Sequence, residues 1–124
     1  MDLRVPTSID GEPVAEAVRS HLEAIRDVLN AHGAHRERLK HALLDLVEFL
    51  ASPSGRTNAN CVAVDSVFTY QLGDHPALED VPDDLGEIMF DLGGALHDTF
   101  SAPHVAENFD STPEQLLRRL RALE

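Results

Sequence analysis

Three side chains in this sequence are of the types that nucleophilic catalysis requires: Cys61, His97 and Asp98. In such a set a thiolate attacks, a histidine accepts the proton, and a carboxylate orients the histidine. With Asn58 as the N-cap of a helix, Cys61 would lie in the first turn, where the helix dipole favours the thiolate. A cysteine without a complete catalytic motif is usually a buried core residue, however, and we find no nucleophile elbow, P-loop or dinucleotide fingerprint. The sequence favours a structural role for Cys61, with a small hydrolase or thiol enzyme as the alternative.

Acidic residues are concentrated in one part of the chain. The formal net charge is −12, and residues 61–117 contain twelve acidic residues and neither lysine nor arginine. This charge argues against a nucleic-acid binder and against a protein that binds anionic membrane surfaces. The acidic stretch either faces solvent and keeps the protein soluble, or offers a surface to a basic partner.

Residues 84–100 are predicted to form an amphipathic helix that aligns several of these acids. At about 100° per residue, four carboxylates share one side of the helix. We call them the carboxylate strip: Asp84, Glu87, Asp91 and Asp98. Asp84 is the predicted N-cap, with Glu87 closing a capping box. The sequence has no EF-hand spacing and one helix cannot surround an ion, so we predict no metal site.

Two further faces of this helix follow from the same spacing. The first is apolar and is predicted to face the core; it consists of Leu85, Ile88, Met89, Leu92 and Leu96. The second consists of Gly86, Phe90, Gly93 and His97, whose two glycines would let another backbone approach closely. Packing on both faces would leave the carboxylate strip as the only face of the helix in contact with water.

A basic cluster lies at the start of another predicted helix and consists of His35, Arg36, Arg38 and Lys40. Positive charge early in a helix opposes the helix dipole unless an anion or an acidic surface balances it. The cluster would bind phosphate, or it would dock onto the carboxylate strip of the same or another subunit. We favour the docking interpretation, because complementary charges of this kind commonly pair within and between subunits.

The remaining elements are read from apolar spacing. Residues 12–33 and 34–52 each carry a helical stripe, which predicts two adjacent antiparallel helices. Ser8 or Asp10 is the predicted N-cap of the first. Residues 60–72 fit both a strand and a helix, and we predict a helix because no second convincing strand is present to pair with it. A last helix is predicted to have Pro113 as its first residue.

Together these features predict an all-α protein, with residues 1–124 forming a single-domain bundle of four or five helices. The absence of long apolar runs, of a signal peptide and of a second cysteine predicts a cytoplasmic protein. No cofactor is expected. The leading functional hypothesis is a non-enzymatic interaction or regulatory module, of the immunity or anti-toxin type, that presents its acidic helix to a basic protein. A self-associating structural protein is a further alternative.

Overall fold

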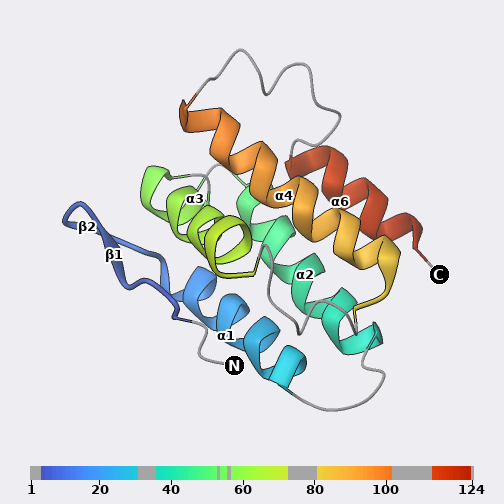
Figure 1. Cartoon of the computed structure of the whole chain (residues 1–124). Coiled ribbons are helices and arrows are strands. Elements are labelled where there is room, and N and C mark those ends of the chain that lie inside the picture. Colours follow the sequence, from blue (N-terminus) through green and yellow to red (C-terminus); the bar gives the residue numbers. More distant parts are fainter. Residues whose placement is uncertain are drawn as a thin grey trace.

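Five α-helices and one π-helical segment make up most of the part of the chain that the structure describes (Figure 1). The computed structural model describes residues 4–30, 36–52, 54–55, 57–72, 81–101 and 113–123, without the side chains of residues 58, 95, 97–101 and 113. The helices are α1 (Glu16–Asn30), α2 (Arg36–Ala51), α3 (Asn58–Asp65), η1 (Ser66–Gln71), α4 (Asp83–Ser101) and α6 (Pro113–Ala122). The predicted all-α bundle of four or five helices is confirmed.

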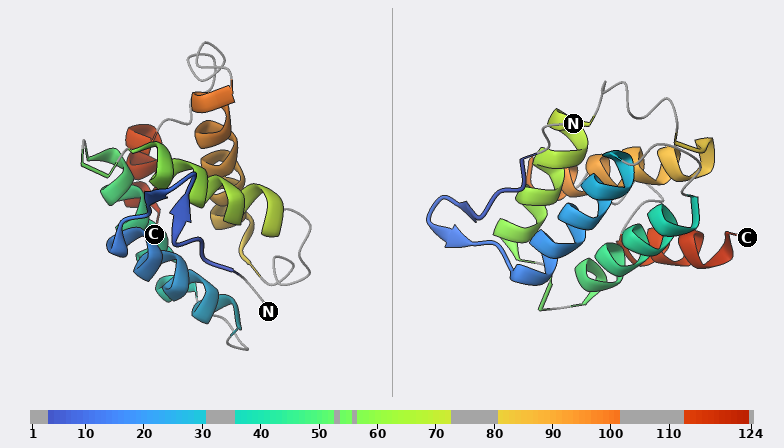
Figure 2. Two further views of the ribbon diagram at one scale, coloured as in Figure 1. Left: turned by 90° about the vertical axis from the view of Figure 1, so that its left-hand side faces the viewer. Right: turned by 90° about the horizontal axis from the view of Figure 1, so that it is seen from below.

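The helices are arranged around α2, which lies between α1 and α6. Helices α3 and α4 pack against each other and lie over this group, and α4 also contacts α6 (Figures 1 and 2). Consecutive helices α1 and α2 are antiparallel, as their short connection predicts. Helix α6 returns alongside α2 from a distant part of the sequence, and it thereby brings the C-terminal arginines to the bundle.

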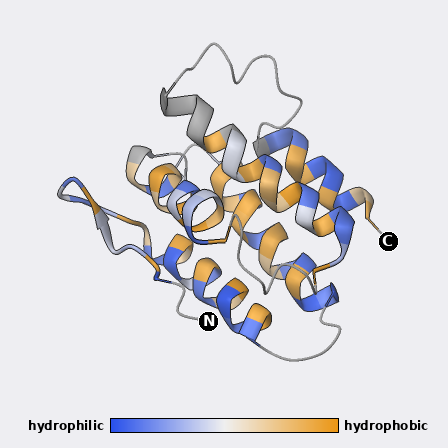
Figure 3. Cartoon of the chain, viewed as in Figure 1, coloured by the Kyte–Doolittle hydropathy of each residue, from blue (hydrophilic) through white to orange (hydrophobic). Residues whose placement is uncertain are grey.

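One hydrophobic core joins all of these helices. Apolar residues line the sides on which helices meet, and hydrophilic residues cover the outer sides of α1 and α6 (Figure 3). The predicted apolar stripe of α2 faces the core, and all four of its leucines are buried: Leu39, Leu43, Leu46 and Leu50. In α1, Val18, Leu22 and Ile25 are buried as expected. Near the end of α1 the inward position is Val28 rather than the predicted Leu29, which is half-buried.

Residues 58–71 are helical throughout, so the helix predicted over 60–72 is confirmed and the strand is excluded. The predicted cap is wrong by one residue: Thr57 is the N-cap of α3, and its side-chain oxygen accepts a hydrogen bond from the Asn60 backbone N–H. From Ser66 onward the helix widens to the π form, in which the Leu72 N–H donates to the carbonyl of Val67, five residues earlier, at 2.9 Å.

A small β-hairpin precedes α1 and was not predicted. Strands β1 (Ser8–Ile9) and β2 (Glu12–Pro13) pair antiparallel, with Ile9 opposite Glu12. The turn residues Asp10 and Gly11 have φ values of 51° and 84°. Two positive φ angles define a type I′ turn, for which Asp-Gly is a preferred pair. Ser8 and Asp10 therefore belong to this hairpin, and the prediction that one of them caps α1 is wrong.

Hydrogen bonds connect both ends of the hairpin segment to the helical bundle. The Gln71 side chain accepts a hydrogen bond from the Arg4 backbone N–H and donates one to the Arg4 carbonyl, both at 2.7 Å. At the other end, the buried Asn60 accepts a hydrogen bond from the Ala15 N–H at 2.8 Å and donates to the Gly55 carbonyl at 2.9 Å. Asn60 thus joins α3, the start of α1 and the loop after α2.

Candidate interaction surface on helix α4

Helix α4 presents its predicted apolar face to the core. All five of the residues assigned to that face are buried: Leu85, Ile88, Met89, Leu92 and Leu96. The position of this face fixes which side chains of α4 reach water. The outward positions with described side chains are Asp83, Glu87, Phe90 and Gly94, all of them exposed.

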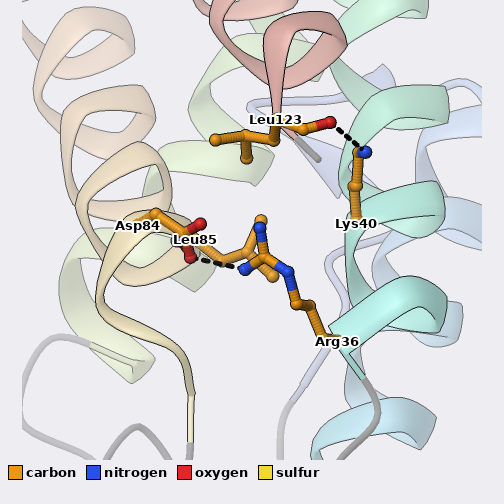
Figure 4. Close-up of polar contacts among 5 residues, drawn as sticks. All are labelled: Arg36, Lys40, Asp84, Leu85 and Leu123. Carbon is orange, nitrogen blue, oxygen red and sulfur yellow. Dashed lines mark hydrogen bonds and ion pairs between the residues drawn. The ribbon is translucent and has the colours of Figure 1, made fainter.

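Asp84 lies in an intramolecular ion pair. Its Oδ1 accepts a hydrogen bond from Arg36 Nη1 at 2.6 Å and another from the Leu85 N–H at 2.8 Å (Figure 4). The hydrogen bond from Arg36 lowers the pKa of the Asp84 carboxyl below its ordinary value, and the same hydrogen bond raises the pKa of Arg36. Helix α4 begins at Asp83, so Asp84 is the second helical residue and the prediction that it is the N-cap is wrong.

Asp91 is also paired within the chain. Its Oδ2 accepts a hydrogen bond from Arg119 Nη1 of α6 at 2.7 Å. Asp84 and Asp91 therefore lie at the edge of α4 that faces α2 and α6. Glu87 lies between them in sequence and is exposed, whereas the side chain of Asp98 lies outside the described residues. Of the carboxylate strip, Glu87 alone is both exposed and without an ion pair to another residue that the structure describes.

The basic cluster, like the carboxylate strip, contains some side chains that are bound within the chain and others that are not shown to be. Arg36 binds Asp84, as described, and Lys40 Nζ donates to the carbonyl of Leu123 at 2.5 Å, just beyond the end of α6 (Figure 4). A lysine at this position satisfies a terminal helix carbonyl and complements the negative end of the helix dipole. Arg38 is exposed, and His35 lies outside the described residues. Two members of the cluster thus bind groups of the same chain.

Cys61 is placed in the hydrophobic core. Its exposed fraction is 0%, and its N–H donates to the Thr57 carbonyl at 3.0 Å within the first turns of α3. A thiol at such a position cannot meet a substrate from solvent without local unfolding. The side chains of His97 and Asp98 lie outside the described residues, so the proposed Cys-His-Asp set is not brought together by any described contact.

Phe90 departs from the sequence prediction. Gly93, a member of the same predicted face, does pack closely on η1, since a Cβ added there would lie 2.8 Å from Thr69 Oγ1. Phe90 instead points to solvent with 80% of its surface exposed. The prediction that the carboxylate strip is the only wet face of this helix is therefore wrong. Helical spacing contains the signal that we missed, because Phe90 lies about 160° around the helix from the buried Leu92.

The described residues contain neither a candidate metal site nor a candidate membrane-spanning helix. Within these ranges no group of three or more His, Cys, Asp or Glu side chains is arranged to hold a metal ion. No helix among them is long and apolar enough to cross a membrane. The chain matches no protein-family model, no curated protein and no solved structure.

Proposed function

We propose that this protein is a non-enzymatic interaction or regulatory module that presents the outer face of α4 to a basic protein partner. The observation that carries the proposal is the distribution of charge around α4. Among the described residues, Arg36 and Arg119 reach this helix, and each is bound to a carboxylate at its inner edge. Among the described residues, the exposed Asp83 and Glu87 form no ion pair.

The docking residues proposed here differ from those expected from the sequence. Glu87 is kept from the expected set and Asp83 is added to it. Asp84 and Asp91 are set aside, because a carboxylate already bound to an arginine must lose that contact before it can bind another cation. The chain supplies no lysine or arginine between residues 61 and 117 to neutralise this face. A partner with clustered Lys and Arg would therefore be attracted to it and steered toward it.

Two further observations support a module without catalytic activity in a reducing compartment. The only cysteine, Cys61, is enclosed in the core, which argues against the thiol-enzyme alternative. Folding also requires no disulfide, which fits the cytoplasm. The proposed functional class is therefore that of regulatory or inhibitory subunits that act by binding an enzyme or toxin.

The proposal is tested by affinity capture from extracts of the source cells with matched charge variants. Asp83→Asn with Glu87→Gln removes two charges from α4, and Glu23→Gln with Asp45→Asn removes two exposed charges from α1 and α2. We expect wild type and the second double variant to retain the same basic protein, and the first to lose it. Raising the salt concentration should release that protein, because exposed charge pairs are screened. Retention that is equal in both double variants and insensitive to salt would refute the proposal.

A further inference from the structure

Two exposed aromatic side chains belong to the two helices α4 and η1, which contact each other. Phe90 of α4 is 80% exposed and Tyr70 of η1 is 71% exposed. Phe90 lies three residues before Gly93, the point at which α4 meets Thr69 most closely, and Tyr70 directly follows Thr69. Both aromatic residues are thus close in sequence to the residues at which α4 and η1 meet. We call Phe90 and Tyr70 the aromatic pair.

Such a pair differs from singly scattered surface hydrophobics, which need no explanation. Phe and Tyr each bury a large apolar area when a partner covers them, and they are among the residues most enriched in binding interfaces. Most of the surface of each ring is in water, and neither belongs to the buried core. The space beside Phe90 is also open, since a Cβ added at the exposed Gly94 would meet nothing within 4 Å.

On the outer face of α4, the charged side chains that the structure describes beside Phe90 have one sign. Glu87 lies three residues before Phe90 and Asp83 one further turn away, both on the outer face of α4. Arg36 and Arg119 are bound to Asp84 and Asp91 at the other edge of the helix. A second copy of this chain would bring a net charge of −12 against the same acidic surface, and like charges oppose such a contact. The complementary occupant carries apolar side chains bordered by lysine or arginine.

We infer that the aromatic pair and the acids beside it bind an amphipathic, basic helix of another protein. This inference rests on the proposed function and names the partner's recognition element. The apolar ridge of that helix covers Phe90 and Tyr70, and its flanking Lys and Arg residues face Asp83 and Glu87. A helix fits because the surface is built from side chains of α4 and η1 and offers no sheet edge for an extended peptide.

The test uses a synthetic amphipathic helix of leucine and lysine, about 18 residues long and so able to span α4. A peptide of the same composition, reordered so that the leucines scatter around the helix, is the control. We expect the full chain to bind the amphipathic peptide roughly tenfold more tightly than the control, as measured by calorimetry. Phe90→Ala and Tyr70→Ala should each remove most of that preference, and Phe90→Leu should retain it, because leucine is still apolar.

The outcomes separate this inference from the proposed function. If Phe90→Ala binds both peptides as wild type does, the inference is overturned. If Phe90→Ala has no effect but Asp83→Asn with Glu87→Gln weakens binding, the proposed acidic docking surface is supported without the aromatic pair. If that double variant binds like Glu23→Gln with Asp45→Asn, the basic character of the partner is refuted and both proposals fail. A chain that forms dimers, which Phe90→Ala dissociates in sedimentation equilibrium, would show that a second copy occupies the surface and would also overturn the inference.

Discussion

Arg36 and Asp84 lie 48 residues apart in the sequence, yet their side chains meet with Nη1 2.6 Å from Oδ1. The pair joins the first residue of α2 to the second residue of α4. An arginine at a helix N-terminus opposes the helix dipole, and the carboxylate of Asp84 balances that charge. The same contact that aligns the two helices also withdraws Asp84 from the surface available to a partner.

The first prediction concerns the dependence of this pair on pH. Because the pKa of Asp84 is lowered in the folded chain, its charged form stabilises the fold. That contribution is fully present above the ordinary pKa of 3.8 and is lost as the pH falls through the lowered folded value. We expect Asp84→Asn to reduce the urea midpoint modestly at pH 7 and to have little effect once wild-type Asp84 is protonated. Asp83→Asn is the control, since Asp83 is also in the first turn of α4 and is exposed. Equal effects of the two variants at pH 7 would show that the helix dipole, not the pair with Arg36, accounts for the difference.

Adjacent glycines of α4 give a second, internally controlled prediction. A Cβ at Gly94 would meet nothing, so Gly94→Ala should stabilise the protein by up to about 1 kcal/mol through helix propensity. A Cβ at Gly93 would lie 2.8 Å from Thr69 Oγ1, which donates to Asp65 Oδ1 at 2.6 Å. Gly93→Ala must displace that hydroxyl, and overpacking of this kind costs about 1–3 kcal/mol. Denaturant unfolding should therefore find Gly93→Ala clearly less stable than Gly94→Ala. If Gly93→Ala were as stable as Gly94→Ala, η1 would accommodate the added methyl group with no loss in the free energy of unfolding, and the prediction would be wrong.

Asn60 gives the third prediction. Asn60→Ala leaves the Ala15 N–H and the buried Gly55 carbonyl without their side-chain partner. Each buried polar group left unsatisfied costs about 1–3 kcal/mol, so the free energy of unfolding should fall by about 2–4 kcal/mol. Asn30→Ala, at the exposed end of α1, should change it little. Amide hydrogen exchange provides a second measurement, because the Ala15 N–H should exchange faster in Asn60→Ala. Unchanged exchange at Ala15 would argue against this hydrogen bond.

The fourth prediction concerns Cys61. Because its exposed fraction is 0%, a thiol reagent should label the native chain only at the rate of its unfolding and should react at once in denaturant. Cys61→Ser places a hydroxyl in an apolar site and should cost about 1–3 kcal/mol. Fast labelling of the native protein would contradict the burial of the thiol and would revive the thiol-enzyme alternative.

Local patterns were sufficient to predict most of the helices. The apolar spacing of α2 and α4 identifies their buried faces, because the residues that share one face recur at helical spacing within a single stretch of sequence. The hairpin was missed although Asp10-Gly11 is a strong turn signal, since each of its strands has only two residues. The π form of η1 has no recognised sequence signal. Its contacts with α4 and with the Arg4 backbone join segments far apart in the sequence, which helical spacing cannot predict.

The pairing of charges could not be predicted from spacing alone. Helical angles place Asp84, Glu87 and Asp91 on one side of α4, but they do not say that α6 lies beside α4. The position of Arg119 follows from the packing of distant segments, and it separates Asp91 from the exposed Glu87. Phe90 was predictable in principle, since its angle places it opposite the core. The glycines at 86 and 93, which predict close packing on the neighbouring side of the helix, indicate the opposite.

The position of α6 has a consequence for synthesis of the chain. Leu116 and Leu120 are fully buried beside α2, and Lys40 reaches the carbonyl of Leu123 across 83 residues of sequence. Until α6 has left the ribosome, the side of α2 that α6 covers in the folded chain is exposed to chaperones and to other nascent chains. A ribosome-bound chain that stops before residue 113 should therefore remain sensitive to protease, and resistance should arise only after α6 has left the exit tunnel.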